Sequence, residues 1–145
     1  MTIQQQVIES GGGVTYDWEN DRVSVKTTLD QADGRVTLVE DMLKPGFHLA
    51  DHWHKKMTEI FYVLEGQVTF KFKNERIVAS PGMTINVPPN VIHEVSCEKG
   101  ARTITVFSPG GFDKYLQELA SLSEAQLADE ALMRNLSEQY DIWMA

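Results

Sequence analysis

The chain of 145 residues has little cysteine and no long apolar run, and each absence excludes a class of protein. Its single cysteine, Cys97, excludes an internal disulfide, so stability has to come from core packing, a bound metal or a partner subunit. The longest apolar runs, such as residues 60–64, are far too short to cross a bilayer, so we expect no membrane partner. The first residues lack the basic and apolar segments of a secretory signal, so we expect a cytoplasmic protein.

Positive charge is also scarce, with 13 Lys and Arg residues against 21 Asp and Glu residues and a formal net charge of −8. No basic cluster exceeds Lys55-Lys56, and an acidic surface repels phosphate backbones, so we expect no nucleic-acid partner. The acidic excess lies mainly in residues 112–145, which we interpret as a solvated helix face. A hydrophobic content of 42% and a charged content of 23% are typical of one globular domain.

The expected single domain, residues 1–145, divides into three parts. Residues 1–13 end in three glycines and are expected to form an N-terminal arm. Residues 14–107 contain short apolar runs separated by turn residues. The stretch Ser108-Pro109-Gly110-Gly111 precedes an expected helical tail over residues 112–145.

Short strands at intervals of about ten residues predict an all-β fold, an antiparallel sandwich or barrel, followed by C-terminal helices. Asp33-Gly34 is typical of a hairpin turn. In the tail, helices are expected over residues 112–120 and after Ser123, which forms a capping-box pattern with Gln126. Both helices should pack on the barrel or on a partner subunit, because an apolar stripe has to be buried. The expected strands are residues 22–26, 35–39, 59–64, 68–72, 76–78, 83–87, 92–97 and 102–107.

Three of the four histidines form a spaced arrangement with one carboxylate. His52 and His54 are two residues apart, so on a strand both imidazoles point to the same face. Glu59 stands at the head of the next strand and His93 on a third strand. Three imidazoles and a carboxylate suit one divalent transition metal (Fe, Mn, Ni, Co, Cu or Zn) and leave open coordination positions, which catalysis at a metal requires.

These residues belong to two spaced motifs that resemble the conserved motifs of the cupin superfamily. Residues 46–66 read G(X)5HXH(X)4E(X)6G, with every fixed residue of the first motif present. Residues 82–97 read G(X)5PXN(X)2H(X)3C and differ from the second motif at Asn90, usually Gly, and at Cys97, usually Asn. Neither difference removes a ligand, and Asn is the commonest non-Gly residue in the left-handed region. The resemblance spans about residues 35–107.

The resemblance implies a double-stranded β-helix (jelly-roll) barrel in which His52, His54, Glu59 and His93 hold the metal. The Ser-Pro-Gly-Gly stretch before a helical tail resembles the quercetin-dioxygenase-like group. That likeness implies dioxygenase-like attack of oxygen on a small aromatic or enol substrate, with Glu59 as the catalytic base. Homodimers are common among cupins, and Trp143 is a candidate anchor of the tail on a barrel or a partner.

Strand alternation also predicts the wall of the substrate pocket. Residues two apart from the expected ligands share their face, and others flank them in sequence. The expected wall is apolar and aromatic, which suits a phenol, flavonol or diketone better than a sugar phosphate. Core packing is the alternative interpretation for most of these side chains. The candidates are Phe47, His48, Trp53, Met57, Phe61, Met83, Ile85 and Val95.

The cupin fold hosts unrelated activities, so other functions stay open. One alternative is a ligand-binding cupin without turnover. Another is a non-redox isomerase or lyase. Cys97 is not expected to act as a nucleophile, because no basic partner is evident and a buried free cysteine is usually inert.

Overall fold

The computed structural model describes residues 3–145 and contains strands followed by three helices. The strands are β1 (Val14–Asp17), β2 (Asp21–Thr27), β3 (Thr37–Leu43), β4 (Phe47–Trp53), β5 (Thr58–Gly66), β6 (Val68–Lys71), β7 (Arg76–Ala79), β8 (Thr84–Val87), β9 (His93–Cys97), β10 (Ala101–Ser108) and β11 (Trp143–Met144). The helices are α1 (Phe112–Ala120), α2 (Glu124–Leu127) and α3 (Glu130–Gln139). Among the described residues, none of the helices is both long and apolar enough to cross a membrane.

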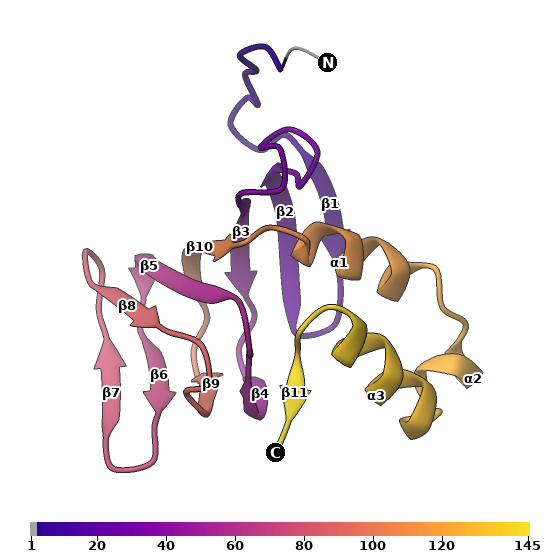
Figure 1. Ribbon diagram of the computed structural model, residues 1–145. Helices are drawn as coiled ribbons and strands as arrows, with labels where there is room; N and C mark the ends of the chain where they lie inside the picture. The colour runs from indigo at the N-terminus through magenta and orange to yellow at the C-terminus, as the bar shows by residue number, and fades with distance from the viewer. Residues whose placement is uncertain (1–2) are drawn as a thin grey trace.

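Within residues 3–145 the strands form two antiparallel sheets (Figure 1). One sheet has the order β1-β2-β3-β10-β5-β8, and the other has the order β11-β4-β9-β6-β7. Strands adjacent in a sheet are often distant in sequence, as expected when a chain winds between the two layers of a jelly roll. The all-β prediction with C-terminal helices is therefore confirmed.

The main core lies between the sheets because alternate side chains of each strand point inward. In β10 the residues Thr103, Thr105 and Phe107 are buried, while the residues between them are half-exposed. Phe61 on β5 and Phe70 on β6 pack edge to face across the barrel, with ring centroids 4.9 Å apart. Aromatic pairs of this kind dominate the packing of a small core.

A second apolar cluster joins the tail to one end of the barrel. It contains Met57 from the barrel side and Leu116 and Ile142 from the tail. In Figure 1 the three helices lie together beside the sheets, and the chain then returns to form β11. The capping box predicted at Ser123 is present. The strand β11 was not predicted, because two residues are too few to show a periodic pattern.

The connection between β2 and β3 differs from a two-residue hairpin. The two strands pair antiparallel, but residues 28–36 separate them. Asp33 and Gly34 adopt positive φ angles of 52° and 78°, so the turn signal was correct locally. The flanking strand was expected over residues 35–39 and instead runs from Thr37 to Leu43.

Candidate metal centre

The structure brings the four expected ligands together inside the barrel. His52 lies on β4, Glu59 on β5 and His93 at the start of β9, while His54 follows directly after β4. All four side chains are buried, and each offers a ligand atom within 4.8 Å of the others. Residues separated by more than thirty positions meet because His52 and His93 are paired across the β4–β9 ladder.

An irregularity in β4 sets which of its side chains point inward. The pairing register with β9 shifts between Leu49 and His52. Before the shift, Phe47 and Leu49 line the barrel interior, and after it His52 does so. A bulge adds one residue and therefore reverses the alternation of every side chain beyond it. This reversal corrects the expectation for His48, whose side chain is 56% exposed and lies 3.1 Å from Glu94.

The three imidazoles are held in one tautomer. The Nδ1 atoms of His52, His54 and His93 lie 2.9, 2.8 and 2.9 Å from the backbone carbonyls of Ala50, Asp141 and Val91. A carbonyl oxygen can only accept, so each Nδ1 carries a proton and donates it. The Nε2 atoms of His54 and His93 face Glu59, and the tautomer leaves each Nε2 free to bind a metal, as in proteins whose ligands are oriented by outer hydrogen bonds.

Glu59 lies at the centre of this arrangement. Its Oε1 atom is 3.2 Å from His54 Nε2 and 3.1 Å from His93 Nε2. Burial acts to raise the pKa of Glu59, but His54 and His93, when their rings are protonated on both nitrogens, outweigh it through hydrogen bonds and charge and lower the pKa to about 2. Burial, together with the neighbouring His93, lowers the pKa of His52 to about 4. Near neutral pH the centre therefore offers an ionised carboxylate and a neutral His52, both suited to a divalent cation.

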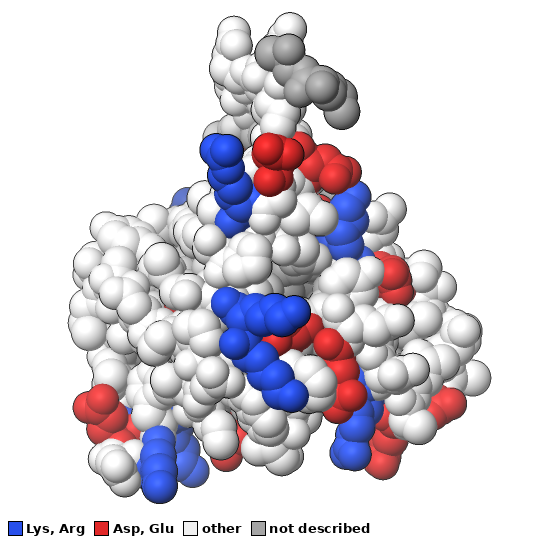
Figure 2. All heavy atoms as spheres, in the orientation of Figure 1, with Lys and Arg blue, Asp and Glu red and all other residues white. Residues whose placement is uncertain are grey.

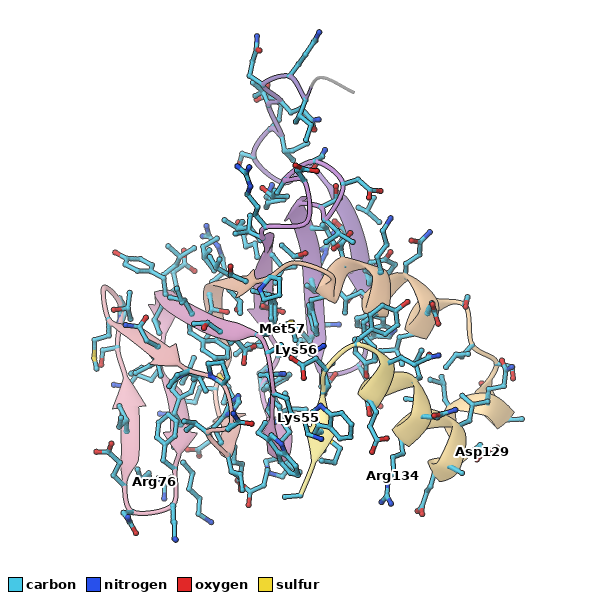
Figure 3. The ribbon with its side chains drawn as sticks, viewed as in Figure 1. Lys55, Lys56, Met57, Arg76, Asp129 and Arg134 are labelled. Atoms are coloured by element: carbon cyan, nitrogen blue, oxygen red, sulfur yellow. The ribbon has the colours of Figure 1, made fainter. Side chains whose placement is uncertain are left out.

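The C-terminal segment supports the ligand loop from outside the barrel. The carboxylate of Asp141 accepts hydrogen bonds from the backbone N–H groups of Lys55, Lys56 and Met57, at 2.7, 2.8 and 2.9 Å. The carbonyl of the same residue accepts the Nδ1 proton of His54. Figure 3 shows the loop residues 55–57 at the junction between the barrel and β11. One residue of the tail thus fixes both the loop that follows His54 and the orientation of its ring.

Trp143 also attaches the C-terminal segment to the barrel. It pairs with Trp53 in the β11–β4 ladder and donates its indole N–H to Asp141 Oδ1 at 3.0 Å. The Lys55 ammonium lies 3.5 Å from the centroid of a Trp143 ring, a cation–π contact. The tail is therefore anchored on the barrel of its own chain. On this face basic and acidic side chains stand side by side (Figure 2).

A cavity of about 90 Å³ lies between the sheets and reaches the cluster at Glu59. Its polar wall consists of Asp21, Asp41, Thr103 and Thr105 in addition to Glu59. Among residues 3–145, no Lys or Arg lines it. Phe112, at the start of α1, stacks on Phe107 with centroids 4.1 Å apart and closes one side. The apolar wall is formed by Leu43, Phe47, Leu49, Phe61, Val68, Val95, Phe107 and Phe112.

Three of the expected pocket residues, Phe47, Phe61 and Val95, line this cavity. The other candidates lie elsewhere. Met83 precedes β8 and is 39% exposed, whereas Ile85 is buried in the main core. Met57 packs in the cluster under the tail, and Trp53 lies against β11, so proximity in sequence to a ligand did not place either side chain in the cavity.

Sequence reasoning missed the two acidic residues of the cavity, Asp21 and Asp41. They stand on the neighbouring strands β2 and β3, on the inward face that also carries Val23 and Val39. A signal was present, because each carboxylate occupies an inward position of its alternating strand. In an acidic chain that signal is easily taken for surface charge.

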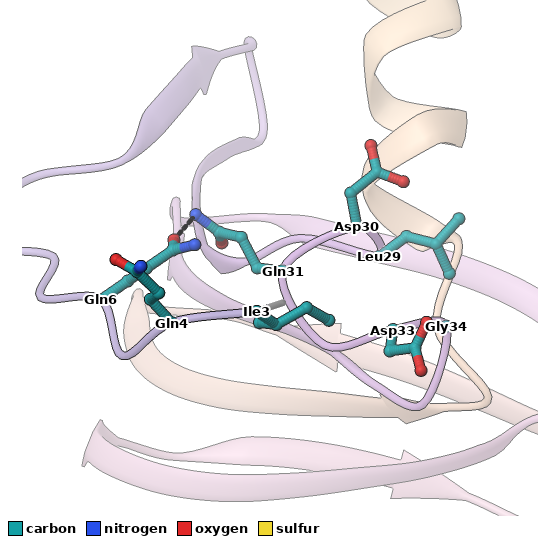
Figure 4. Close-up of a pocket in the computed structure, with 8 residues that line it drawn as sticks. All are labelled: Ile3, Gln4, Gln6, Leu29, Asp30, Gln31, Asp33 and Gly34. Atoms are coloured by element: carbon teal, nitrogen blue, oxygen red, sulfur yellow. Dashed lines mark hydrogen bonds between the residues drawn. The ribbon is translucent and has the colours of Figure 1, made fainter. Parts of the chain in front are cut away.

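A larger open groove lies outside the barrel, between the arm and the β2–β3 connection (Figure 4). It measures about 900 Å³ and is lined by polar residues such as Gln4, Gln6 and Gln31, the last two joined by a hydrogen bond. Neither the four clustered ligands nor Asp21 and Asp41 line this groove. The barrel cavity is therefore the stronger candidate for chemistry.

Two antiparallel sheets that enclose three histidines and a glutamate define a β-barrel protein with a metal-site-like cluster. Residues 39–107 match the family model described as the cupin domain. The motif resemblance is confirmed over that range.

A curated relative gives a more specific likeness. Quercetin 2,3-dioxygenase of Bacillus subtilis (strain 168) is 28% identical over 122 residues, which cover 83% of this chain. The chain spans only 36% of the length of that relative. The two proteins are distant homologues.

Solved structures with the same fold carry varied names. KdgF from Halomonas sp. superposes with a TM-score of 0.65 at 19% identity, covering 75% of this chain and 99% of that one. The polyketide cyclase RemF from Streptomyces resistomycificus has a TM-score of 0.64 at 16% identity, covering 72% and 80%. Ectoine synthase from P. lautus has a TM-score of 0.59 at 20% identity, covering 80% and 75%. These likenesses show the fold alone.

Proposed function

We propose that the protein is a metal-dependent cupin enzyme with dioxygenase-like activity on a small aromatic or enol substrate. The observation that carries this proposal is the buried cluster of His52, His54, Glu59 and His93, with all three Nδ1 protons bonded to carbonyls. Burying three imidazoles and a carboxylate without a ligand has no evident structural benefit, because each polar group loses its hydration.

The donor set fits one first-row divalent ion, Fe, Mn, Ni, Co, Cu or Zn. Three nitrogen donors and one carboxylate oxygen leave positions for substrate in an octahedral site. Bound there, such an ion supplies Lewis-acid chemistry and, where it is redox-active, electron transfer toward oxygen.

The residues of this chain supply the remaining functions. Glu59 lines the cavity and is ionised, so it can accept the acidic proton of an enol or a phenol. The aromatic walls at Phe47, Phe61 and Phe112 exclude water from the substrate. The distant homology to quercetin 2,3-dioxygenase supports oxygen chemistry for this site.

The test begins with elemental analysis of protein purified without added metal or chelator. We expect about one equivalent of metal per chain, and its loss in the double variant His52→Ala/His54→Ala. Oxygen uptake is then followed with the loaded protein and a panel of flavonols and β-diketones. Absence of uptake across the panel, with metal present, would contradict the dioxygenase-like activity.

A non-redox isomerase or lyase is the second candidate, and the acidic pair in the cavity favours it. Asp21 and Asp41 can relay protons, which such reactions require. Product formed equally well without oxygen would establish this candidate. Tight binding of a ligand without any product would instead establish a ligand-binding cupin.

We also propose a homodimer, as expected from the family. Met42 on β3 and Tyr62 on β5 leave 49% and 41% of their surface exposed on the outward face of one sheet. A second copy would bury this apolar surface. Light scattering that gives the mass of one chain at all concentrations would refute the dimer.

A further inference from the structure

Two carboxyl groups share the interior of the barrel with the metal-site-like cluster. Asp21 stands on β2 opposite Leu43, and Asp41 stands on β3 opposite Val23, so the two acids are diagonal neighbours. Their carboxyl groups are within hydrogen-bond reach of each other, and Thr105 donates its hydroxyl to Asp41 Oδ2 at 3.2 Å. Both line the cavity that reaches Glu59.

One oxygen of this pair of carboxyl groups lacks a hydrogen-bond donor among the described residues. Among residues 3–145, Asp21 Oδ1 is a buried side-chain oxygen that no donor reaches. Two ionised carboxylates cannot hydrogen-bond each other, but a single proton between them satisfies the contact. Burial and the charge of Asp21 raise the pKa of Asp41 well above its usual range, and burial also raises that of Asp21. One shared proton leaves the pair with one negative charge.

The pair and the cluster lie at different levels of the barrel. On β10, Thr103 is paired with Asp41 and Phe107 with Glu59. Four positions along β10 separate the two levels, which corresponds to about 13 Å along the backbone. The side chains that point inward from the two levels shorten this separation. Apolar residues such as Phe61 and Val95 occupy the wall between them. The cavity therefore has a polar group at each end and an apolar middle.

The cavity is small. Its volume is about 90 Å³. A β-diketone or a comparable short enol is of this order, whereas a flavonol with its fused rings is several times larger. Widening the cavity would require movement of the packed side chains Phe61 and Phe107, which are almost fully buried.

We propose that this site takes a small, neutral molecule with two separate oxygen-bearing groups, such as a β-diketone, and that Asp41 and Asp21 hydrogen-bond the group that lies away from Glu59. The inference rests on the proposed function of the cluster as a metal site for a small-molecule substrate. A pair with one proton can donate to a carbonyl oxygen and accept from a hydroxyl group. Its negative charge, with no Lys or Arg in the wall, disfavours an anionic group at that end.

A structural role for the pair explains the observations less well. Inward positions beside Val23 and Val39 would be filled at lower free energy by apolar residues, because a half-buried carboxyl without full partners is unfavourable. A substrate hydroxyl group, such as that of an enol, would supply the donor that Asp21 Oδ1 lacks. Asp41 and Asp21 are thus specificity-determining residues of the proposed reaction.

The experiment compares two ligands of nearly equal shape, acetylacetone and acetoacetate. In acetoacetate a charged oxygen replaces one methyl group of acetylacetone. Calorimetry with metal-loaded protein under anaerobic conditions measures binding without turnover. We expect wild-type protein to bind acetylacetone at least about tenfold more tightly, which corresponds to about 1.4 kcal/mol. We expect quercetin not to compete. The double variant Asp21→Asn/Asp41→Asn should remove most of the preference, because it keeps the shape and removes the pair's one negative charge, which either single variant would retain.

Asp30→Asn is the matched control, because it removes one surface charge outside the cavity, from a side chain that is 78% exposed. If the double variant fails to fold, Asp21→Ser/Asp41→Ser provides the same test, because it also removes the charge of the pair. Equal preference in the variant and wild type, tighter binding of acetoacetate, competition by quercetin or no binding of acetylacetone to metal-loaded protein would each overturn the inference. Because turnover is not needed, a lack of oxygen uptake would contradict the dioxygenase-like activity and leave this test intact.

Discussion

Replacement of Asp141 by glycine should weaken metal binding from a position outside the barrel. The residue has a φ of 62°, a region that glycine adopts freely, so Asp141→Gly removes the carboxylate without adding backbone strain. The variant loses the acceptor for the N–H groups of Lys55, Lys56 and Met57 and for the Trp143 indole. The loop beside His54 then loses its attachment to the tail.

The size of the effect follows from these hydrogen bonds. Bonds to a charged acceptor contribute about 1.5–3 kcal/mol each when buried. Asp141 is half-exposed, its contributions are not additive, and water can replace part of them. We therefore expect the free energy of unfolding of the metal-free protein to fall by about 2–4 kcal/mol. The backbone carbonyl of residue 141, which orients His54, is then held less firmly in place. We therefore expect metal affinity to fall by about ten- to a hundredfold.

The assay is competition of the folded, metal-free protein with a chelator for Co²⁺, read by the visible absorption of the bound ion. Asp129→Ala is the control for the loss of a carboxylate that accepts a backbone N–H, because Asp129 caps α3 through the Leu132 N–H and lies away from the cluster. It should lower stability by about 1 kcal/mol and leave the affinity and the spectrum unchanged. Wild-type affinity and spectrum in Asp141→Gly would refute a positioning role for the C-terminal segment.

Three further outcomes test the centre and the barrel. Burial acts to lower the pKa of His54, but Glu59 outweighs it and raises that pKa, so a proton competes with the metal. Affinity measured by chelator competition should therefore still rise with pH above about 6.5, the ordinary pKa of a histidine, and level off once the pH exceeds the raised pKa of the ring. Gly66→Ala should destabilise the protein in urea unfolding more than Gly46→Ala, since both have positive φ but only at Gly66 would a Cβ meet a backbone oxygen, at 2.5 Å. Phe70→Ala should lower the free energy of unfolding by about 3–5 kcal/mol, because its ring is fully buried; a loss below about 1 kcal/mol would contradict its place in the core.

Local patterns were sufficient to predict the barrel and the convergence of His52, His54, Glu59 and His93. Strand alternation brings the first two to one face, and the turn glycines mark where the chain reverses. The prediction for His48 failed because it assumed unbroken alternation along β4. The bulge between Leu49 and His52 depends on pairing with β9, a partner distant in sequence. A register shift of this kind has no local signature.

Other features depended on contacts over long distances in the chain. Asp141 reaches His54 across 87 positions, and Thr105 reaches Asp41 across 64. In the sequence Asp141 looked like one more acid of a solvated helical tail. Its role becomes visible only when β11 pairs with β4. The cavity volume likewise depends on how Phe112 packs over the barrel, which no periodicity encodes.

Three residues that support this site lie outside the segment that matches the cupin family model. Residues 39–107 contain the four clustered ligands. Asp21, Phe112 and Asp141 lie before or after that segment, and they respectively supply a polar end of the cavity, one of its walls and the support of His54. Solved structures that share this fold carry varied names, so the fold alone does not set the chemistry, and such additions are one place where differences can arise. Exchanging β2 or the tail between cupins should therefore change ligand preference while retaining metal binding wherever the equivalent of Asp141 is kept.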